Sequence, residues 1–454
     1  MLIGRNNELD RLLDFYDREN SQIVVVYGAK YIGKTALIKE FMTDKPGFYY
    51  KCEEASEREQ HYRFGNFFAE KKIKTLRYPD FKEIFKAFGQ KHSQKKVLVF
   101  DEFQNLIKAC PDFMEELISF IHSSWNNQEY LVILSSSSIE FVENTMVSKI
   151  KEAAFELSGF LKVKELTFND LREYFSLYSN EDCLTCWSCL GGVPGLWKMF
   201  DEKASVKDNI VNKIIAPEGP LHNIYNELVF NELREMGIYN TILSSLSDGL
   251  IKLNDLYEHT GFSRAKISVY LKNLMELELV EKVFSIDTDG RENSLKGIYG
   301  ISNKFVDFYF SFIYKNASFM EEYGPGEFYS IFVAPYLKAY VSKYYGEVCL
   351  EYMLKANDRK RLPIKIERFG TWLGKNGNID IVMADDSNKV ICGLCIYDKA
   401  MFTYEDYLKL LDNAKAAKLT PDYIYLFTNQ RFDEKLSLEG KVRKNIKLLY
   451  SDDL

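Results

Sequence analysis

The sequence has few of the residues that keep a chain open, and it has no segment that suits a membrane. Proline and glycine number only 10 and 25 among 454 residues, so long structureless linkers are not expected. No apolar run approaches the roughly 18 residues that a membrane-spanning helix needs, and the first residues contain no apolar stretch of signal-peptide length. We therefore expect compact domains, a cytoplasmic location and no membrane partner.

An excess of positive charge is also lacking. The 59 lysines and arginines are outnumbered by 66 aspartates and glutamates, which gives a formal net charge of -7. The chain as a whole therefore does not attract nucleic acid or an anionic membrane, and any contact with DNA has to be local.

The cysteines do not indicate a disulfide scaffold, because eight in a chain of this length fit a reducing compartment. Three of them, Cys183, Cys186 and Cys189, follow one another at a spacing of three. On a helix this spacing predicts a buried stripe beside Trp187 and Leu190. The alternative is a zinc or iron-sulfur site, which would need a fourth ligand that is not close in sequence.

The length and the apolar pattern predict three regions, since the chain has room for about three domains at about 150 residues each. Residues 1–200 alternate helical stretches with short apolar runs, which is the pattern of a parallel sheet with helices on both faces. Residues 201–300 turn helical, and residues 301–454 mix helices with strands. The strands that we expect are residues 23–27, 48–50, 97–100, 131–134, 379–383 and 390–397.

The strongest motif is a phosphate-binding loop. Residues 28–35 read G-x-x-x-x-G-K-T directly after an expected strand and before an expected helix. The glycines let backbone N–H groups face a phosphate, the lysine would reach the β and γ oxygens of a nucleotide, and the threonine would bind Mg²⁺. The residues of this loop that we expect to bind the nucleotide are Gly28, Gly33, Lys34, Thr35 and Ala36.

Two adjacent carboxylates end another expected strand. Asp101 and Glu102 follow the apolar residues 97–100, and ligands of parallel sheets bind at this carboxyl end. We expect Asp101 to hold Mg²⁺ through water and Glu102 to act as the general base, with Lys34 as a further catalytic residue. Ser137, after the next strand, is a candidate sensor of the γ-phosphate. A polar loop or a helix cap would also explain the serines there.

These motifs are flanked by Gly4 and Arg5 ahead of them and by Gly192-Val193-Pro194 behind them. In this order they resemble the archaeal-type ATPases of the signal-transduction (STAND) branch of AAA+ proteins. The resemblance implies a P-loop ATPase domain over residues 1–200 with a helical lid at its end, and ATP and Mg²⁺ as cofactors. It also implies that Gly4, Arg5 and Pro194 lie near the adenine. The alternative for Gly192-Val193-Pro194 is a turn that ends a helix.

One position departs from the family pattern. Phe160 stands where members often carry a candidate arginine finger, a residue that raises turnover by roughly 10³ to 10⁵ in phosphoryl transfer. The departure predicts slow hydrolysis, or a basic residue supplied by Lys149, Lys151, Lys162 or a partner chain in an oligomer. We therefore expect a switch and not a fast motor.

The middle region has the spacing of a helix-turn-helix. Residues 253–259 and the helix 264–277 flank a turn in which Ser263 is the expected helix cap. Residues 279–284 would open a wing, and the region resembles the winged-helix domain that follows the ATPase core in this family. Nearby glutamates weaken the attraction of phosphate, so a winged helix that only packs within the molecule is the alternative to DNA binding. The DNA-binding candidates are Arg264, Lys266, Ser268 and Lys272.

Residues 301–454 resemble a carboxyl-terminal domain of unknown function whose core is similar to restriction-endonuclease-like nucleases. The resemblance implies an α/β fold and a metal site in which Asp380 and Glu347 supply acids. Leu394 and Ile396 stand where the second strand's acid and lysine belong, and apolar side chains can neither bind Mg²⁺ nor support a hydroxide. We expect a degenerate nuclease site without activity.

The expected fold class is therefore α/β, with a P-loop parallel-sheet ATPase core, a winged-helix domain and a restriction-endonuclease-like domain. The leading hypothesis is an ATP-binding, Mg²⁺-dependent and slowly hydrolysing switch. Its nucleotide state would govern the binding of duplex DNA or of an unknown protein partner. The alternatives are a DNA-binding regulator that ATP merely stabilises and an ATP-gated nuclease, which the broken strand disfavours.

Overall fold

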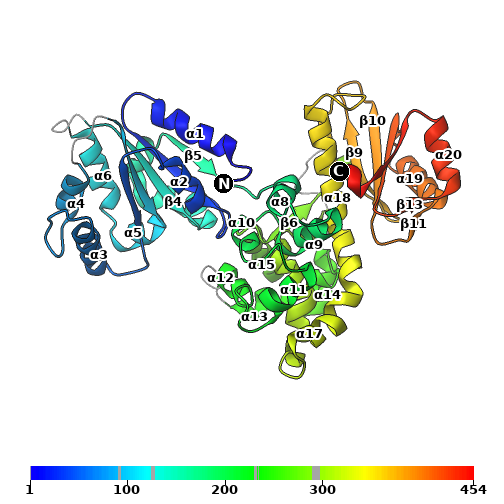
Figure 1. The fold of residues 1–454 in the computed structure, drawn as a ribbon, viewed down its shortest axis with the longest axis horizontal. Helices are drawn as coiled ribbons and strands as arrows, with labels where there is room; N and C mark the ends of the chain where they lie inside the picture. Colours follow the sequence, from blue (N-terminus) through cyan, green and yellow to red (C-terminus); the bar gives the residue numbers. More distant parts are fainter. Residues whose placement is uncertain (1, 90–93, 124–127, 230–232, 234, 289–296) are drawn as a thin grey trace. The chain divides into compact units, whose positions relative to one another are not determined.

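The structure, a computed structural model, describes residues 2–89, 94–123, 128–229, 233, 235–288 and 297–454. The chain divides into two compact units (Figure 1). Unit 1 comprises Met1–Leu166 and Val193–Gly195, and unit 2 comprises Thr167–Gly192 and Leu196–Leu454. The domain borders that the sequence predicts at residues 200 and 300 stay predictions.

Unit 1 is built on a five-stranded parallel sheet in the order β2-β3-β4-β1-β5. The strands are β1 (Gln22–Tyr27), β2 (Gly47–Lys51), β3 (Lys96–Asp101), β4 (Tyr130–Ser136) and β5 (Gly159–Lys162). The first four confirm the predicted strands. β3 and β4 are buried along their whole length because helices cover both faces of the sheet, and such strands read as continuous apolar runs.

Helices α3 to α6 cover one face of this sheet, and α1 and α2 lie on the other (Figure 1). The core beneath α3 to α6 is rich in phenylalanine. On α4, Phe81, Ile84, Phe85 and Phe88 recur at the spacing of one helix face, and all four are buried. The helices of unit 1 are α1 (Asn6–Asp17), α2 (Lys34–Phe41), α3 (Glu57–Glu70), α4 (Phe81–Phe88), α5 (Phe103–Ala109), α6 (Phe113–His122) and α7 (Met146–Ile150).

Unit 2 begins with the helices that the sequence predicts as a lid. They are α8 (Phe168–Tyr174) and α9 (Asn180–Leu190), each started by a capping box. The thiols of Cys183, Cys186 and Cys189 on α9 are free and buried, which confirms the predicted stripe. Burial raises the pKa of Cys183 to about 11. Among the described residues, no group of three histidines, cysteines or acids is placed to hold a metal ion.

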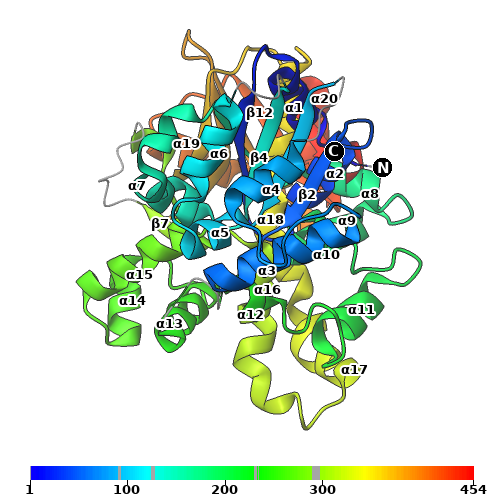
Figure 2. The same cartoon turned by 90° about the vertical axis from the view of Figure 1, so that its left-hand side faces the viewer.

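The predicted helix-turn-helix is present in unit 2. α14 (Leu253–Thr260) and α15 (Arg264–Glu276) flank the turn, and the Ser263 side chain accepts a hydrogen bond from Lys266 N, as a helix cap does. The strands β6 (Val280–Val283) and β7 (Ile298–Ile301) pair antiparallel behind it as a wing. Figure 2 shows α13 (Met236–Ser247), α14 and α15 grouped together, and each of them contacts the other two.

The last part of unit 2 is a second five-stranded sheet, in the order β14-β12-β10-β9-β8, with the long helix α18 against it. β8, β9 and β10 are antiparallel, whereas β10, β12 and β14 are parallel. β9 and β10 confirm two predicted strands. The elements are α18 (Ala334–Asp358), β8 (Arg368–Leu373), β9 (Asn378–Ala384), β10 (Val390–Ile396), α19 (Tyr404–Ala416), β12 (Tyr423–Thr428), α20 (Glu434–Val442) and β14 (Ile446–Tyr450).

Several short elements complete unit 2 between the lid and α18. They are α10 (Pro194–Trp197), which begins on the last residues of unit 1, α11 (Val206–Asn209), α12 (Ile224–Val229), α16 (Lys304–Phe308) and α17 (Pro325–Phe328). The two-residue strands β11 (Met401–Phe402) and β13 (Arg431–Phe432) pair with each other. Within the described part of the chain, no helix is both long and apolar enough to span a membrane.

Candidate nucleotide site

The phosphate loop connects β1 to α2 and turns at two glycines. Gly28 has a φ of +153° and Gly33 a φ of +103°, a region that side chains disfavour. A Cβ on Gly28 would lie 2.4 Å from Val163 O, so the loop passes a neighbouring backbone too closely for any other residue. The two glycines therefore fulfil the predicted requirement for a tight phosphate loop.

Lys34, the first residue of α2, is buried and turns back over this loop. Its Nζ donates to Gly28 O at 2.8 Å and to Ala29 O at 3.0 Å. Burial lowers the pKa of Lys34, and the charges of Glu102 and Asp101 oppose that effect. A buried ammonium whose acceptors are two neutral carbonyl groups keeps an attraction for a stronger, anionic acceptor such as a phosphate.

Two segments distant in sequence hold the tip of the loop. The Arg5 guanidinium donates to Ile32 O at 2.8 Å and pairs with Glu8 at 2.8 Å. From the other segment, Gly195 N donates to Tyr31 O at 2.9 Å. The structure thus brings the predicted Gly4-Arg5 and Pro194 segments to the phosphate loop. Their contact with an adenine stays a prediction.

The Asp101 carboxylate lies at the end of β3 next to the loop and is 4% exposed. Its Oδ2 accepts hydrogen bonds from the Tyr49 hydroxyl and, at 3.4 Å, from the Thr35 hydroxyl. Its Oδ1 is buried and has no hydrogen-bond partner among the described residues. The structure therefore brings Thr35 and Asp101 together, as the sequence predicts, and adds Tyr49.

Glu102 follows in a left-handed conformation, with a φ of +56°. Its Oε2 accepts from Ser137 Oγ at 2.7 Å, from Ser137 N at 3.1 Å and from Gln104 Nε2 at 2.6 Å. Ser137 therefore contacts the predicted general base directly, and its role as a phosphate sensor stays a prediction. Gln104 was not expected, because an isolated glutamine in a helix carries no sequence signal.

The residues of this site fit a magnesium nucleotide. A buried carboxylate oxygen without a partner is an acceptor for a water molecule of the metal, and hydroxyl and carboxylate oxygens are the ligands that Mg²⁺ prefers. The glycine loop and Lys34 provide N–H donors for phosphate oxygens.

The arginine position of the family pattern is filled by an apolar side chain. Phe160 lies on the edge strand β5 and is 46% exposed. Of the three lysines considered as replacements, Lys162 pairs with Glu143 at 2.8 Å, whereas Lys149 and Lys151 are exposed on and just after α7. A basic residue from Lys149, Lys151, Lys162 or a partner chain stays a prediction.

The four DNA-binding candidates all lie on α15. Arg264 covers the Tyr257 ring at 4.0 Å and donates to Asn254, and Lys266 lies 4.8 Å from the Phe262 ring. Lys272 is held by Glu276 at 3.6 Å, so part of its charge is neutralised. Ser268 is exposed.

The two acids of the expected nuclease remnant lie apart. Asp380 on β9 accepts from Cys395 N at 2.8 Å, whereas Glu347 on α18 pairs with Lys304 at 2.8 Å. Tyr345 on α18 packs on Tyr397, which follows β10, so this face of the helix is turned toward the sheet. Glu347 comes two residues later, which is about 200° of helix rotation, and therefore lies on roughly the opposite face. The structure therefore does not bring Glu347 to Asp380.

The strand register agrees with the assignment of the two apolar positions. β9 and β10 pair Ile381 with Gly393, so Leu394 follows opposite Asp380 and shares its face of the sheet with Ile396. The inactivity that this arrangement suggests stays a prediction.

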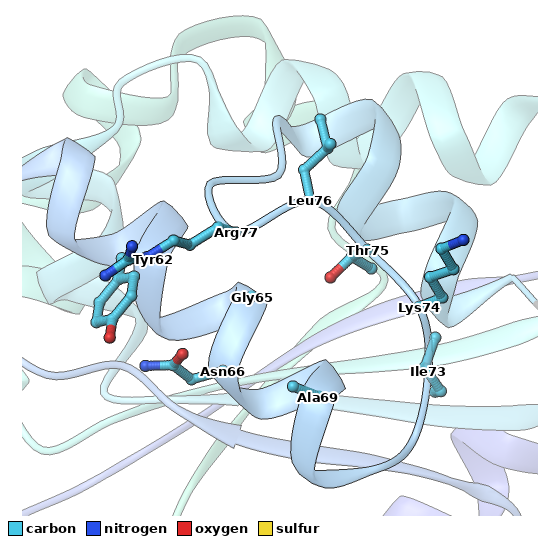
Figure 3. Close-up of a pocket in the computed structure, with 9 residues that line it drawn as sticks. All are labelled: Tyr62, Gly65, Asn66, Ala69, Ile73, Lys74, Thr75, Leu76 and Arg77. Carbon is cyan, nitrogen blue, oxygen red and sulfur yellow. The ribbon is translucent and has the colours of Figure 1, made fainter.

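A separate pocket of about 440 Å³ lies on the surface of unit 1, between α3 and the segment that follows it (Figure 3). None of its residues belongs to the phosphate loop or to the carboxylate pair. They are Tyr62, Gly65, Asn66, Ala69, Ile73, Lys74, Thr75, Leu76 and Arg77.

Comparison with known families agrees with these regions. Residues 2–200 match a family described as an ATPase domain predominantly from Archaea. Residues 240–282 match a bacterial regulatory protein family of the arsR type, which has a helix-turn-helix. Residues 309–410 match a family of archaeal and bacterial proteins of unknown function, so the likeness to nucleases stays a prediction.

Individual relatives span most of the chain. Uncharacterized protein MJECL04 of Methanocaldococcus jannaschii is 28% identical over 393 residues, which cover 86% of this chain and 85% of that protein. The Walker-type ATPase paby2304 of Pyrococcus abyssi is 16% identical with a TM-score of 0.49, over 68% of this chain and 96% of that one. The ORC2 protein of Aeropyrum pernix is 13% identical with a TM-score of 0.46, over 71% and 95%. The motif and the parallel sheet give unit 1 the fold of a P-loop ATPase core, and the family match over residues 2–200 agrees with this fold.

The close contact between Gly195 and Tyr31 is testable with Gly195→Ala. The new Cβ would lie 2.7 Å from Tyr31 O, so we expect a loss of about 1 to 3 kcal/mol in stability and a weaker affinity for nucleotide. Gly346→Ala, at a helix position with no atom within 4 Å of the added Cβ, is the control and should stabilise by about 1 kcal/mol. Thermal unfolding and nucleotide titration measure both effects. If the two variants have the same stability and the same nucleotide affinity, the close contact between Gly195 and Tyr31 is contradicted.

Burial raises the pKa of Asp380 to about 6, and the hydrogen bond from the Cys395 N–H opposes that shift. A carboxyl with a raised pKa in the folded protein favours folding at low pH, and this stability is lost as the pH rises from about 4 to about 6. Asp380→Asn should therefore leave the melting temperature unchanged at pH 4 and raise it by a few degrees at pH 8. The exposed Asp386→Asn is the control. If Asp380→Asn shifts the melting temperature equally at pH 4 and pH 8, the cost of burying the Asp380 charge is not the cause of the effect.

Proposed function

We propose that the protein is a Mg²⁺-dependent ATP-binding switch that hydrolyses ATP slowly. The observation that carries the proposal is the hydrogen bond between Gly195 N and Tyr31 O. Gly195 belongs to the three residues of unit 1 that interrupt the sequence of unit 2. A phosphate that changes the conformation of the phosphate loop would therefore act on residues 193–195, and the chain continues into unit 2 at both ends of this segment.

The side chains of the site have distinct tasks in this proposal. Lys34 would exchange its loop carbonyl acceptors for phosphate oxygens, and Thr35 with Asp101 would hold the metal. Magnesium, when bound, neutralises phosphate charge. Glu102 would orient and deprotonate the attacking water.

Slow hydrolysis is supported by the contacts of Glu102. Three donors, from Ser137 and Gln104, already occupy its Oε2. A base held in this way has to leave these hydrogen bonds, or share them, before it accepts a proton from water. Phe160 at the family's arginine position also favours slow hydrolysis, because it cannot supply the positive charge that an arginine finger does.

The lid helices are fastened to the rest of unit 2, which supports transmission of the nucleotide state. Glu351 on α18 accepts from Phe168 N at 2.8 Å and from Asn169 N at 3.2 Å, so it caps the first turn of α8. Asn180, at the start of α9, donates to Asp452 at 3.0 Å. A movement of the lid would therefore carry the carboxyl-terminal sheet with it.

A second set of contacts connects the lid to the segment that follows the wing. The Tyr340 hydroxyl lies 3.1 Å from Ser188 O on α9 and 3.2 Å from Lys304 O on α16. The Lys304 ammonium lies 4.9 Å from the Trp187 ring. Because all of these residues are buried, the lid and α16, the helix that follows the wing, would respond together.

The central test is ATP hydrolysis and nucleotide binding by three variants. Lys34→Ala should lose nucleotide binding, because it removes the buried ammonium that lies over the loop carbonyl groups of Gly28 and Ala29. Glu102→Gln should still bind ATP but hydrolyse it roughly 10² to 10⁴ times more slowly. Lys72→Ala, an exposed lysine outside the site, is the control. Binding of ATP by Lys34→Ala with wild-type affinity would refute the proposed site.

A DNA-binding regulator is the second candidate function, and the exposed cations of α15 favour it. Lys266→Glu should lower the affinity for duplex DNA and reduce its salt dependence, since a phosphate contact releases counterions. Lys207→Glu, on α11, is the control with the same charge change. Titration of a labelled duplex at several salt concentrations, with ATP and with ADP, measures the effect. DNA binding that is equal with both nucleotides would favour the regulator over the switch.

A further inference from the structure

The two oxygens of the Asp101 carboxylate have different surroundings. Oδ2 accepts from two hydroxyl groups, those of Tyr49 and Thr35, while Oδ1 is buried without a partner among the described residues. The Thr35 hydroxyl lies 3.4 Å from Oδ2, which is long for a hydrogen bond between oxygens. The Tyr49 hydroxyl is therefore the contact that fixes the orientation of this carboxylate.

We propose that Tyr49 is a positioning residue for the metal site, because it holds Oδ2 of Asp101 and so fixes the orientation of this carboxylate beside Thr35, the other residue that would hold a nucleotide-bound Mg²⁺. This inference rests on the proposed nucleotide site. It adds a residue that none of the motifs contains and assigns it an effect on metal affinity. Groups that orient a metal-binding carboxylate typically contribute 10-fold to 100-fold to metal affinity.

The place of Tyr49 in the sheet makes it suited to this task. β2 pairs with β3 in a register that aligns Lys51 with Asp101 and Tyr49 with Val99. Lys51 is the residue of β2 opposite Asp101, and Tyr49 precedes it by two residues. The long side chain of Tyr49 spans this offset to reach the Asp101 carboxylate. The Lys39 ammonium, 5.4 Å from the ring, packs on it from α2. A donor on a rigid strand orients a carboxylate better than a donor on a loop does.

The Tyr49 hydroxyl is the donor in this contact, since the carboxylate oxygen of Asp101 accepts.

The experiment is a Mg²⁺ titration of the binding of a fluorescent ADP analogue to the full-length protein. Tyr49→Phe removes one oxygen atom and keeps the ring, so we expect half-saturation at a 10-fold to 100-fold higher Mg²⁺ concentration. ADP affinity without Mg²⁺ should not change. Tyr50→Phe is the matched control, because the adjacent Tyr50 hydroxyl is buried without a partner among the described residues and its ring stacks on Phe64 at 3.9 Å. Its Mg²⁺ titration should equal that of the wild type.

A double variant separates positioning from a merely structural role. In Asp101→Asn, no carboxylate is left to orient, so adding Tyr49→Phe should not change the Mg²⁺ requirement further. A loss of equal size in both backgrounds would overturn the proposal, because the tyrosine would then act through the fold. Tighter Mg²⁺ binding by Tyr49→Phe would also overturn it, since the hydroxyl would then compete with the metal.

The outcomes distinguish this inference from the proposed function. If the wild type does not bind ADP at any Mg²⁺ concentration, the proposed nucleotide site fails. If the wild type binds in a Mg²⁺-dependent way and Tyr49→Phe behaves identically, only the role of Tyr49 fails. Should Tyr49→Phe not fold, Tyr49→His, which keeps a ring with an N–H donor, replaces it. It should bind Mg²⁺ within about 10-fold of the wild type, and a larger loss would overturn the proposal.

Discussion

The site depends on two backbone carbonyl groups of the phosphate loop that accept hydrogen bonds from outside it. Tyr31 O accepts from Gly195 N, and Ile32 O accepts from the Arg5 guanidinium. In a trans peptide the carbonyl and the following N–H point in opposite directions, so fixing Ile32 O fixes the Gly33 N–H away from Arg5. Tyr31 itself has a φ of +64°, which a residue with a side chain adopts only where its surroundings hold it. The donors thus shape the loop before any phosphate arrives.

The same edge of the sheet gives its two carboxylates different surroundings, and so different tasks. Asp101 is buried, has one oxygen held by hydroxyl groups and keeps the other oxygen without a partner. Glu102, the next residue, has one oxygen engaged by three donors. Glu102 also has a left-handed backbone, with a φ of +56°. Neighbouring carboxylates with such different environments suit one metal-holding role and one proton-accepting role.

Local patterns predict much of this arrangement, whereas contacts between distant segments do not follow from them. Strands β1, β3 and β4 could be predicted because each is a continuous apolar run, and the loop because its glycines have a fixed spacing. Tyr49 could not, since its contact with Asp101 depends on the register of two strands about 50 residues apart. Glu347 was expected beside Asp380, but the phase of α18 turns it toward Lys304 instead. Helix phase is set by packing and not by the identity of one acid.

The contacts within unit 2 have a thermodynamic consequence for its partners. Glu351 caps α8 and Asp452 accepts from the start of α9, so the lid and the carboxyl-terminal sheet share hydrogen bonds that cannot be kept if one moves without the other. Suppose that ATP favours one arrangement of the lid and that a ligand of the sheet prefers the same arrangement. ATP then raises the affinity for this ligand by some factor, and the ligand must raise the affinity for ATP by the same factor. The effect of any partner on ATP affinity therefore measures the coupling directly, whether or not hydrolysis is fast.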